Sequence, residues 1–162
     1  MTVRDARLPD DEPAILAFIA GLQDYEARFE PNRRRDPAFA AEHWRDLQER
    51  CAEKHGHMAI AEDIVADVGP KPVGWAFAYE QHGELFVHAP ERRHGFLAEI
   101  YVVPEARRTG HGRALIAACE AWSRGRGHKL MTIGVLAKNA GALRTYAGAG
   151  YQPYTSLLRK YL

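Results

Sequence analysis

Two glycines one residue apart, Gly110 and Gly112, stand directly before a helix-forming stretch in the sequence RRTGHGRALIAACEAW. The first N–H groups of a helix have no partner within the helix and lie at the positive end of its dipole. Because glycine has no side chain, an anion can approach such N–H groups closely. Arg107, Arg108 and Arg113 would add positive charge around them. The chemistry that this spacing suits is the binding of a diphosphate.

The same glycines could instead form only a tight turn into the helix, and a lone Gly-x-Gly favours that simpler interpretation. The stretch also departs from two better-known phosphate motifs. It lacks the Gly-Lys-Ser/Thr of a P-loop, and Leu115 stands where the dinucleotide-binding fingerprint needs a third glycine. The surrounding elements must therefore decide between a binding loop and a turn.

A strand, the loop, a helix and a second strand follow one another here. The sequence HGFLAEIYVV (94–103) predicts a strand, and a helix follows that ends at Gly125 or Gly127. KLMTIGVL (129–136) is apolar on both faces, as a buried parallel strand is. A right-handed crossover would place the loop at the C-terminal end of the first strand. The apolar face of the helix consists of Leu115, Ala118, Cys119 and Trp122.

The rest of the chain alternates strands and helices, which predicts one α/β (α+β) domain over residues 1–162. Asn139 opens a further helix that ends at Gly148 or Gly150, and a final strand runs from Tyr151 to Tyr161. The other predicted elements are strands at 2–8, 57–62 and 71–81, helices at 10–22 and 37–51, and a hairpin extension at 84–88.

Composition narrows the class of protein. The chain is 46% hydrophobic and 27% charged, which suits one soluble domain with a core. No stretch reads as a membrane helix or a signal peptide, so we expect a cytoplasmic protein without a membrane partner. The two cysteines lack a metal spacing and the eight histidines lack matching carboxylates, so no metal site is predicted.

The net charge of +1 conceals an asymmetry along the chain. Residues 92–162 carry 12 basic and 3 acidic groups, whereas residues 1–91 carry 10 basic and 18 acidic ones. The C-terminal half suits a polyanion and the N-terminal half a cation, unless the charges simply form solvated faces. The basic run Arg33–Arg35 has no aromatic residues interleaved with it, so no nucleic-acid partner is expected.

A second motif makes the pattern specific. Asn139, Ala142, Tyr146, Gly150 and Tyr151 occur in that order after the second strand. Together with Arg-x-x-Gly-x-Gly in the loop, this spacing resembles the GNAT superfamily of acyl-CoA-dependent N-acetyltransferases. The likeness is close over about residues 97–152. It implies a mixed central sheet of about six to seven strands, about four flanking helices and a parallel strand pair that splays apart.

The resemblance implies acetyl-CoA as the cofactor. In this family the loop N–H groups bind the coenzyme A pyrophosphate and the preceding strand holds the pantetheine arm. Asn139 could equally be an ordinary helix N-cap. The cofactor-binding positions implied in this sequence are Tyr101, Val102, Val103, Arg107, Arg108, Thr109, Gly110, His111, Gly112, Arg113, Asn139, Ala142 and Tyr146.

The resemblance also implies catalytic roles. Glu99 stands where many members of the family carry an acidic residue, so we expect it to act as the general base. It could also be an exposed carboxylate or an anion that binds the acceptor. Tyr146 matches the tyrosine that protonates the departing thiolate, although it could be a core tyrosine. A backbone N–H near Val102 or Val103 would stabilise the oxyanion.

The acceptor would enter between the first two helices and the central strands. Its aromatic and acidic lining suits a small cationic amine, and Trp75 and Tyr79 could equally belong to the core. A peptide or protein amine is the alternative acceptor, and a non-catalytic acyl-CoA sensor is the alternative function. A homodimer is also compatible with the family. The acceptor-lining residues expected are Tyr25, Glu26, Phe29, Trp75, Tyr79 and Glu80.

Overall fold

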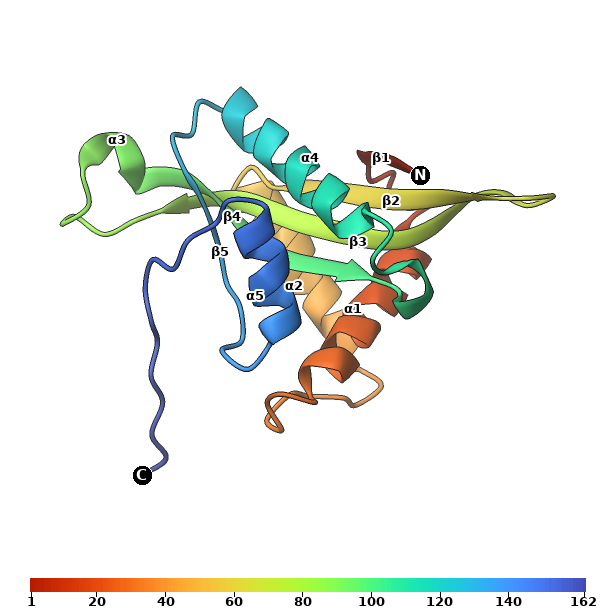
Figure 1. The fold of residues 1–162 in the computed structure, drawn as a ribbon, viewed down its shortest axis with the longest axis horizontal. Helices are drawn as coiled ribbons and strands as arrows, with labels where there is room; N and C mark the ends of the chain where they lie inside the picture. The colour runs from red at the N-terminus through yellow and green to blue at the C-terminus, as the bar shows by residue number, and fades with distance from the viewer.

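The computed structural model describes all residues from Met1 to Leu162 (Figure 1). Its five strands form one sheet in the order β1-β2-β3-β4-β5, with β1 to β4 antiparallel and β4 parallel to β5. None of its helices combines the length and the apolar character needed to cross a membrane. The strands are β1 (Thr2–Asp5), β2 (His57–Val65), β3 (Gly69–His82), β4 (Arg93–Val102) and β5 (Met131–Ile133).

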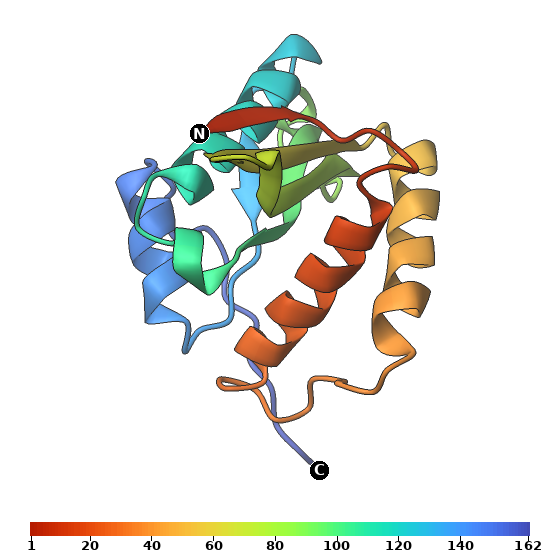
Figure 2. The same ribbon diagram turned by 90° about the vertical axis from the view of Figure 1, so that its right-hand side faces the viewer.

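Helices cover both faces of the sheet, α1 and α2 on one face and α4 and α5 on the other (Figure 2). In α1, α2 and α4 the apolar residues recur at helical spacing, so each of these helices buries one stripe against the strands. The helices are α1 (Glu12–Glu26), α2 (Phe39–Glu53), α3 (Ala89–Arg92), α4 (His111–Gly125) and α5 (Ala140–Gly148), with the 3-10 turn η1 at Pro104–Ala106.

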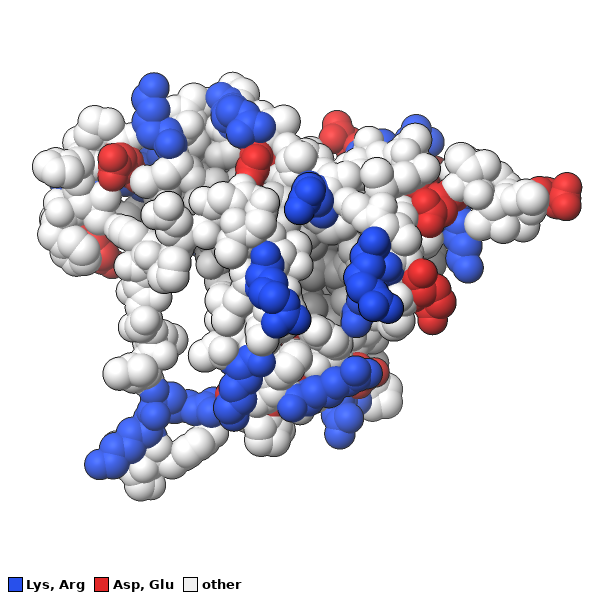
Figure 3. Space-filling model, in the orientation of Figure 1, with Lys and Arg blue, Asp and Glu red and all other residues white.

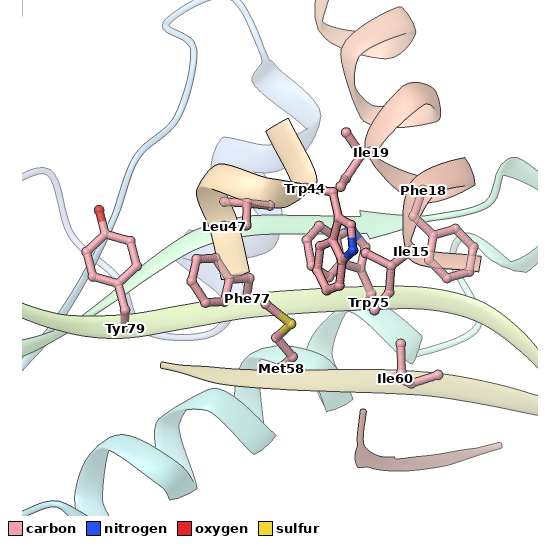
Figure 4. Close-up of a cluster of buried hydrophobic side chains, with 10 residues drawn as sticks. All are labelled: Ile15, Phe18, Ile19, Trp44, Leu47, Met58, Ile60, Trp75, Phe77 and Tyr79. Atoms are coloured by element: carbon pink, nitrogen blue, oxygen red, sulfur yellow. The ribbon is translucent and has the colours of Figure 1, made fainter. Parts of the chain in front are cut away.

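Each face of the sheet has its own core. Beneath α1 and α2, Trp75 and Phe77 of β3 are completely buried against Ile15, Ile19 and Trp44 (Figure 4). On the other face, α4 packs its predicted apolar side against β2, β3 and β4. Burial raises the pKa of Cys119 on that side to about 12, so its thiol stays protonated and acts as packing.

The parallel pair separates soon after it forms. Only Gly95 to Leu97 of β4 pair with Met131 to Ile133 of β5. β4 continues to Val102 while still paired with β3 on its other side. The second half of β4 therefore presents an open edge, and the predicted strand 129–136 is shorter than expected.

Two predicted strands are absent, which leaves five strands instead of six or seven. Residues 84–88 form a turn before α3, and Arg92 closes it by donating to the carbonyl oxygens of Val87 and Leu85, both at 2.8 Å. The segment from Tyr151 to Tyr161 runs away from the body without strand structure (Figure 1). No backbone hydrogen bond joins it beyond Tyr151, because no strand lies beside it.

Candidate active site

The loop before α4 offers a row of free backbone donors. From Arg108 to Arg113, six consecutive N–H groups make no hydrogen bond to a protein acceptor, and internal bonding resumes only at Ala114, whose N–H donates to Gly110 at 3.0 Å. Most of these residues are exposed, and N–H groups at a helix start have no partner within the helix, so the row is available to an acceptor-rich ligand. The positive end of α4 lies at the same place.

The two glycines shape this row in different ways. Gly110 is the N-cap of α4 with φ of 104°, a left-handed conformation that favours glycine. Gly112 has no such requirement, and a Cβ placed on it would meet nothing within 4 Å. The absence of its side chain therefore leaves space above the N–H groups, as an anion would need.

The three arginines do not share one role. Arg107 donates from Nε to the carbonyl oxygen of Val102 at 2.9 Å, and its guanidinium lies 4.5 Å from the ring centroid of Tyr25 and 5.4 Å from that of Tyr101. It thus joins α1 to the end of β4. Arg108 and Arg113 are exposed beside the loop. Lys and Arg side chains occupy the middle of this face, and carboxylates lie mostly at its margins (Figure 3).

The direction of each N–H group along β4 distinguishes the two candidate oxyanion donors, Val102 and Val103. The N–H of Val103 donates to the carbonyl oxygen of Val73 at 2.9 Å, so it points toward β3. In an antiparallel ladder the N–H groups of successive residues point to opposite sides. The N–H of Val102 therefore faces the open edge next to the loop, and Val103 is the weaker candidate of the two.

Tyr146 lies close to two carboxylates. Burial, together with smaller contributions from the negative charges of Glu26 and Glu99, raises the pKa of its phenol to about 12. The phenol consequently keeps its proton at neutral pH, as a general acid must. Tyr146 comes from α5, Glu26 from α1 and Glu99 from β4, so three elements converge on this point.

Glu99 has a partner that sequence reasoning missed. Nε2 of His43, on α2, lies 3.0 Å from Oε1 of Glu99, and the His43 ring stacks on Phe39 at 5.2 Å between centroids. His43 lies four residues before Leu47, which is buried on α2, and residues four apart share a helix face. That spacing was a usable signal that His43 turns toward the sheet, but nothing local linked it to a residue 56 positions away.

The end of α1 contributes the aromatic and acidic groups expected near an acceptor. Burial raises the pKa of Glu26, with a smaller contribution from the charge of Glu99, while Arg33 at 3.1 Å opposes the rise. Tyr25 and Phe29 stack edge-to-face at 5.3 Å between centroids. Lys138, just before α5, donates to the carbonyl oxygen of Phe29 at 3.2 Å and brings the two segments together.

Three of the expected lining residues lie elsewhere. Trp75 is 0% exposed and Tyr79 is 6% exposed, so both rings belong to the core, as Figure 4 shows. Glu80 pairs in register with Gly95 at the end of β4 far from the loop, where basic side chains surround it. These side chains are not available to an acceptor because packing or ion pairing already occupies them.

Asn139 has a structural role. Its side-chain oxygen accepts a hydrogen bond from the N–H of Ala142 at 3.0 Å, which makes it the N-cap of α5. The cap fixes the start of the helix that carries Tyr146. Asn139 therefore influences the site only by fixing the position of α5. The N–H of Ala142 already donates to Asn139 and is not free for a ligand.

A diphosphate cradle beside a splayed strand pair, with a protonated phenol and a carboxylate nearby, defines a group-transfer enzyme that uses a nucleotide-linked carrier. The sequence model of the acetyltransferase (GNAT) family matches residues 19–151. The chain therefore belongs to the acetyltransferase (GNAT) family.

A curated relative and two solved structures resemble the chain. Aminoglycoside N(6')-acetyltransferase type 1 of Klebsiella aerogenes is 41% identical over 56 residues, which are 35% of this chain and 37% of the relative. The matched part thus spans little more than a third of the relative. A tetramutant of a Bacillus halodurans protein has a TM-score of 0.80 at 14% identity, with both chains fully covered. An aminoglycoside 6'-N-acetyltransferase from Acinetobacter haemolyticus has a TM-score of 0.70 at 18% identity, covering 100% and 98%.

Proposed function

We propose that the protein transfers an acetyl group from acetyl-CoA to the primary amine of a small cationic molecule, by direct attack with both substrates bound. The row of six free N–H groups from Arg108 to Arg113 carries the proposal, because it fits the diphosphate of coenzyme A. Bound acetyl-CoA would supply a thioester as the acyl donor. The open edge of β4 beside the loop offers free backbone groups to its amide-containing arm.

The residues near Tyr146 support a cationic acceptor. Glu26 and Glu99 place two carboxylates near one phenol, and Tyr25 and Phe29 add aromatic rings. Carboxylates attract an ammonium group and aromatic faces bind cations. The curated relative is named as an aminoglycoside N(6')-acetyltransferase, so aminoglycosides are the first acceptors to test.

Glu99 would accept the proton of the acceptor amine. An alkyl ammonium has a pKa of about 10.4, so removing its proton at neutral pH costs about 4 to 5 kcal/mol. The hydrogen bond between Glu99 and His43 gives that proton a second site, since the imidazole is partly exposed to solvent. Glu99 is thus the base, and His43 positions it and relays the proton.

Tyr146 and Val102 would act on the other side of the reaction. Tyr146 retains its phenolic proton at neutral pH and can donate it to the departing sulfur. The N–H of Val102 points to the open edge and can donate to the thioester oxygen as negative charge develops there. Each role uses a group that the fold leaves without another partner.

The test measures thiol release from acetyl-CoA with a panel of aminoglycosides, polyamines and a lysine-containing peptide. We expect Tyr146→Phe and Glu99→Gln each to lower kcat about 10²-fold, the usual size of one acid or base contribution. The defect of Glu99→Gln should shrink between about pH 7 and about pH 9, where more amine is already free. Tyr146→Phe should show no such recovery.

Matched controls are Tyr154→Phe and Glu91→Gln, which change an exposed tyrosine and an exposed carboxylate outside the site. Both should retain wild-type kcat. Faster turnover of the peptide than of any small amine would replace the proposed acceptor class. Coenzyme A binding without turnover of any amine would indicate a sensor and would refute the enzymatic proposal.

A further inference from the structure

His111 is a buried histidine directly behind the loop. It is the first residue of α4 and 2% exposed, yet both ring nitrogens have polar neighbours. Nε2 lies 2.8 Å from Oδ1 of Asp63 on β2. Nδ1 lies 2.6 Å from Oγ1 of Thr109 and 3.1 Å from the carbonyl oxygen of Ala106. The imidazole therefore spans from the sheet to both ends of the loop.

The contacts around this ring favour its doubly protonated form. The hydroxyl of Thr109 donates to the carbonyl oxygen of Ala106 at 2.6 Å, which leaves a lone pair of Thr109 toward Nδ1. Nδ1 thus faces acceptors only, and Nε2 faces a carboxylate. Only the imidazolium form carries a proton on both ring nitrogens, so only this form can donate to both sets of acceptors. His111, which is buried, and Asp63, which is partly exposed, then form an ion pair.

This cation lies at the end of α4 that is already positive. A positive charge at a helix N-terminus is unfavourable unless an anion offsets it. Asp63 offsets part of it but is also 3.9 Å from the amino group of Met1, and Arg108 and Arg113 add further positive charge nearby. A bound diphosphate would offset the remainder.

We propose that His111, held by Asp63, is a positioning residue for the diphosphate of coenzyme A. It fixes the loop from Ala106 to Gly112 in the shape that exposes the six N–H groups, and it supplies positive charge behind them. The proposal rests on the proposed function, because it takes this loop as the coenzyme site. It adds a contribution to coenzyme affinity that the loop backbone alone would not give.

The test compares coenzyme A binding by calorimetry for the wild type and His111→Gln at pH 7. We expect the variant to bind about 10-fold more weakly, as for the loss of one charge-assisted contact. Acetyl-pantetheine lacks the diphosphate, so its KM should be the same for both proteins.

Asp63→Asn provides a second variant that keeps an acceptor for Nε2 and removes the charge. It should weaken coenzyme A binding, because the imidazole loses the carboxylate that holds it in place. His128→Gln is the matched control, because it removes a buried histidine beyond the other end of α4. It should lower stability and leave coenzyme affinity unchanged.

Several results would overturn the proposal. Equal coenzyme A affinity of the wild type and Asp63→Asn would refute it, even if His111→Gln failed to fold. An equal loss of affinity for acetyl-pantetheine and coenzyme A would refute a role at the diphosphate. Failure of the wild type to bind coenzyme A would instead refute the proposed function, and the inference with it.

Discussion

Helix α4 has a buried histidine near each end, and each histidine faces a carboxylate from the sheet. At the N-terminal end, Nε2 of His111 lies 2.8 Å from Asp63. Beyond the C-terminal end, Nε2 of His128 lies 3.1 Å from Glu80, and its Nδ1 contacts Oγ of Ser123 at 3.0 Å. The two arrangements use the same chemical groups but differ in what surrounds them.

The C-terminal arrangement is complete within the protein. Arg93 and Arg126 approach Oε2 of Glu80 at 3.2 and 3.3 Å, and Nε2 of His82 lies 3.4 Å from Oε1, so both carboxylate oxygens have protein partners. Burial alone would raise the pKa of Glu80, but the hydrogen bond from His128 and the charges of both arginines outweigh it and hold the pKa at about 2. Such a closed network stabilises the fold and offers nothing to a ligand.

The N-terminal arrangement is incomplete within the protein. The six N–H groups beside His111 have no acceptor, and Asp63 is 37% exposed. The difference shows that a buried histidine–carboxylate pair does not itself identify a functional site. Free donors next to the pair are the distinguishing feature, and variants at the two ends should therefore separate stability from coenzyme affinity.

The largest effect on stability should come from Glu80→Ala. It leaves His128, Arg93 and Arg126 without their shared anion, and breaking a buried ion pair costs about 3 to 5 kcal/mol of unfolding free energy. Urea denaturation at pH 7 measures the loss, and coenzyme affinity of the folded protein should not change. Asp46→Asn, which breaks the exposed pair with Arg50, should cost less than about 1 kcal/mol.

The same network predicts a pH dependence. Because the folded pKa of Glu80 lies below its usual value of 4.5, the carboxylate stabilises the fold above about pH 4.5. This contribution should disappear as pH falls from about 4.5 toward 2. Glu80→Ala should therefore approach wild-type stability at the acidic end. A constant stability difference over that range would contradict the assigned network.

Glycine substitutions should separate the two ends of α4 by affinity. Gly112→Ala places a methyl group where the anion approaches, so we expect about 10-fold weaker coenzyme A binding with no loss of stability. Gly125→Ala is the matched change at the other end, where a Cβ also meets nothing within 4 Å. It should keep wild-type affinity. Equal affinities of the two variants would contradict a coenzyme site at Gly112.

Gly110→Ala should combine both effects. Its φ of 104° strains any residue with a Cβ, at a cost of about 1 to 2 kcal/mol. Relaxation of that strain would also move the N–H row, so coenzyme affinity should fall along with the melting temperature. Thermal denaturation and calorimetry on the same sample measure the two losses.

The sequence predicted the parts that depend on neighbouring residues. The glycine spacing, the boundaries of α4 and α5 and most strands follow from local periodicity and turn chemistry, and the structure confirms them. Tyr151 to Tyr161 has a strand-like composition, but a strand also needs a partner, and that pattern holds no information about one. Residues 84–88 differ for a related reason, since the side chain of Arg92 closes their turn.

The site was harder to predict because its pairs are distant in sequence. His43 and Glu99 are 56 positions apart, and His111 and Asp63 are 48 positions apart. Only sheet register and helix packing bring them together. The same limitation affected Glu80. Its carboxylate suggested a place in the lining of the acceptor site, but the fold surrounds it with basic groups.

The smallest effects should come from the hydroxyl beside each histidine, Thr109 at the N-terminal end and Ser123 at the C-terminal end. Ser123→Ala leaves Nδ1 of His128 unpaired in the core and should cost about 1 kcal/mol of stability without changing coenzyme affinity. Thr109→Val removes a part-buried hydroxyl, but Nδ1 of His111 keeps the carbonyl oxygen of Ala106 as a partner at 3.1 Å, so stability should change less than in Ser123→Ala. Coenzyme A affinity should nevertheless fall about 2- to 3-fold, because Nδ1 of His111 loses an acceptor that helps hold the loop. Denaturation and calorimetry on both variants would show opposite patterns if the two ends of α4 differ as inferred, and matching patterns would contradict that difference.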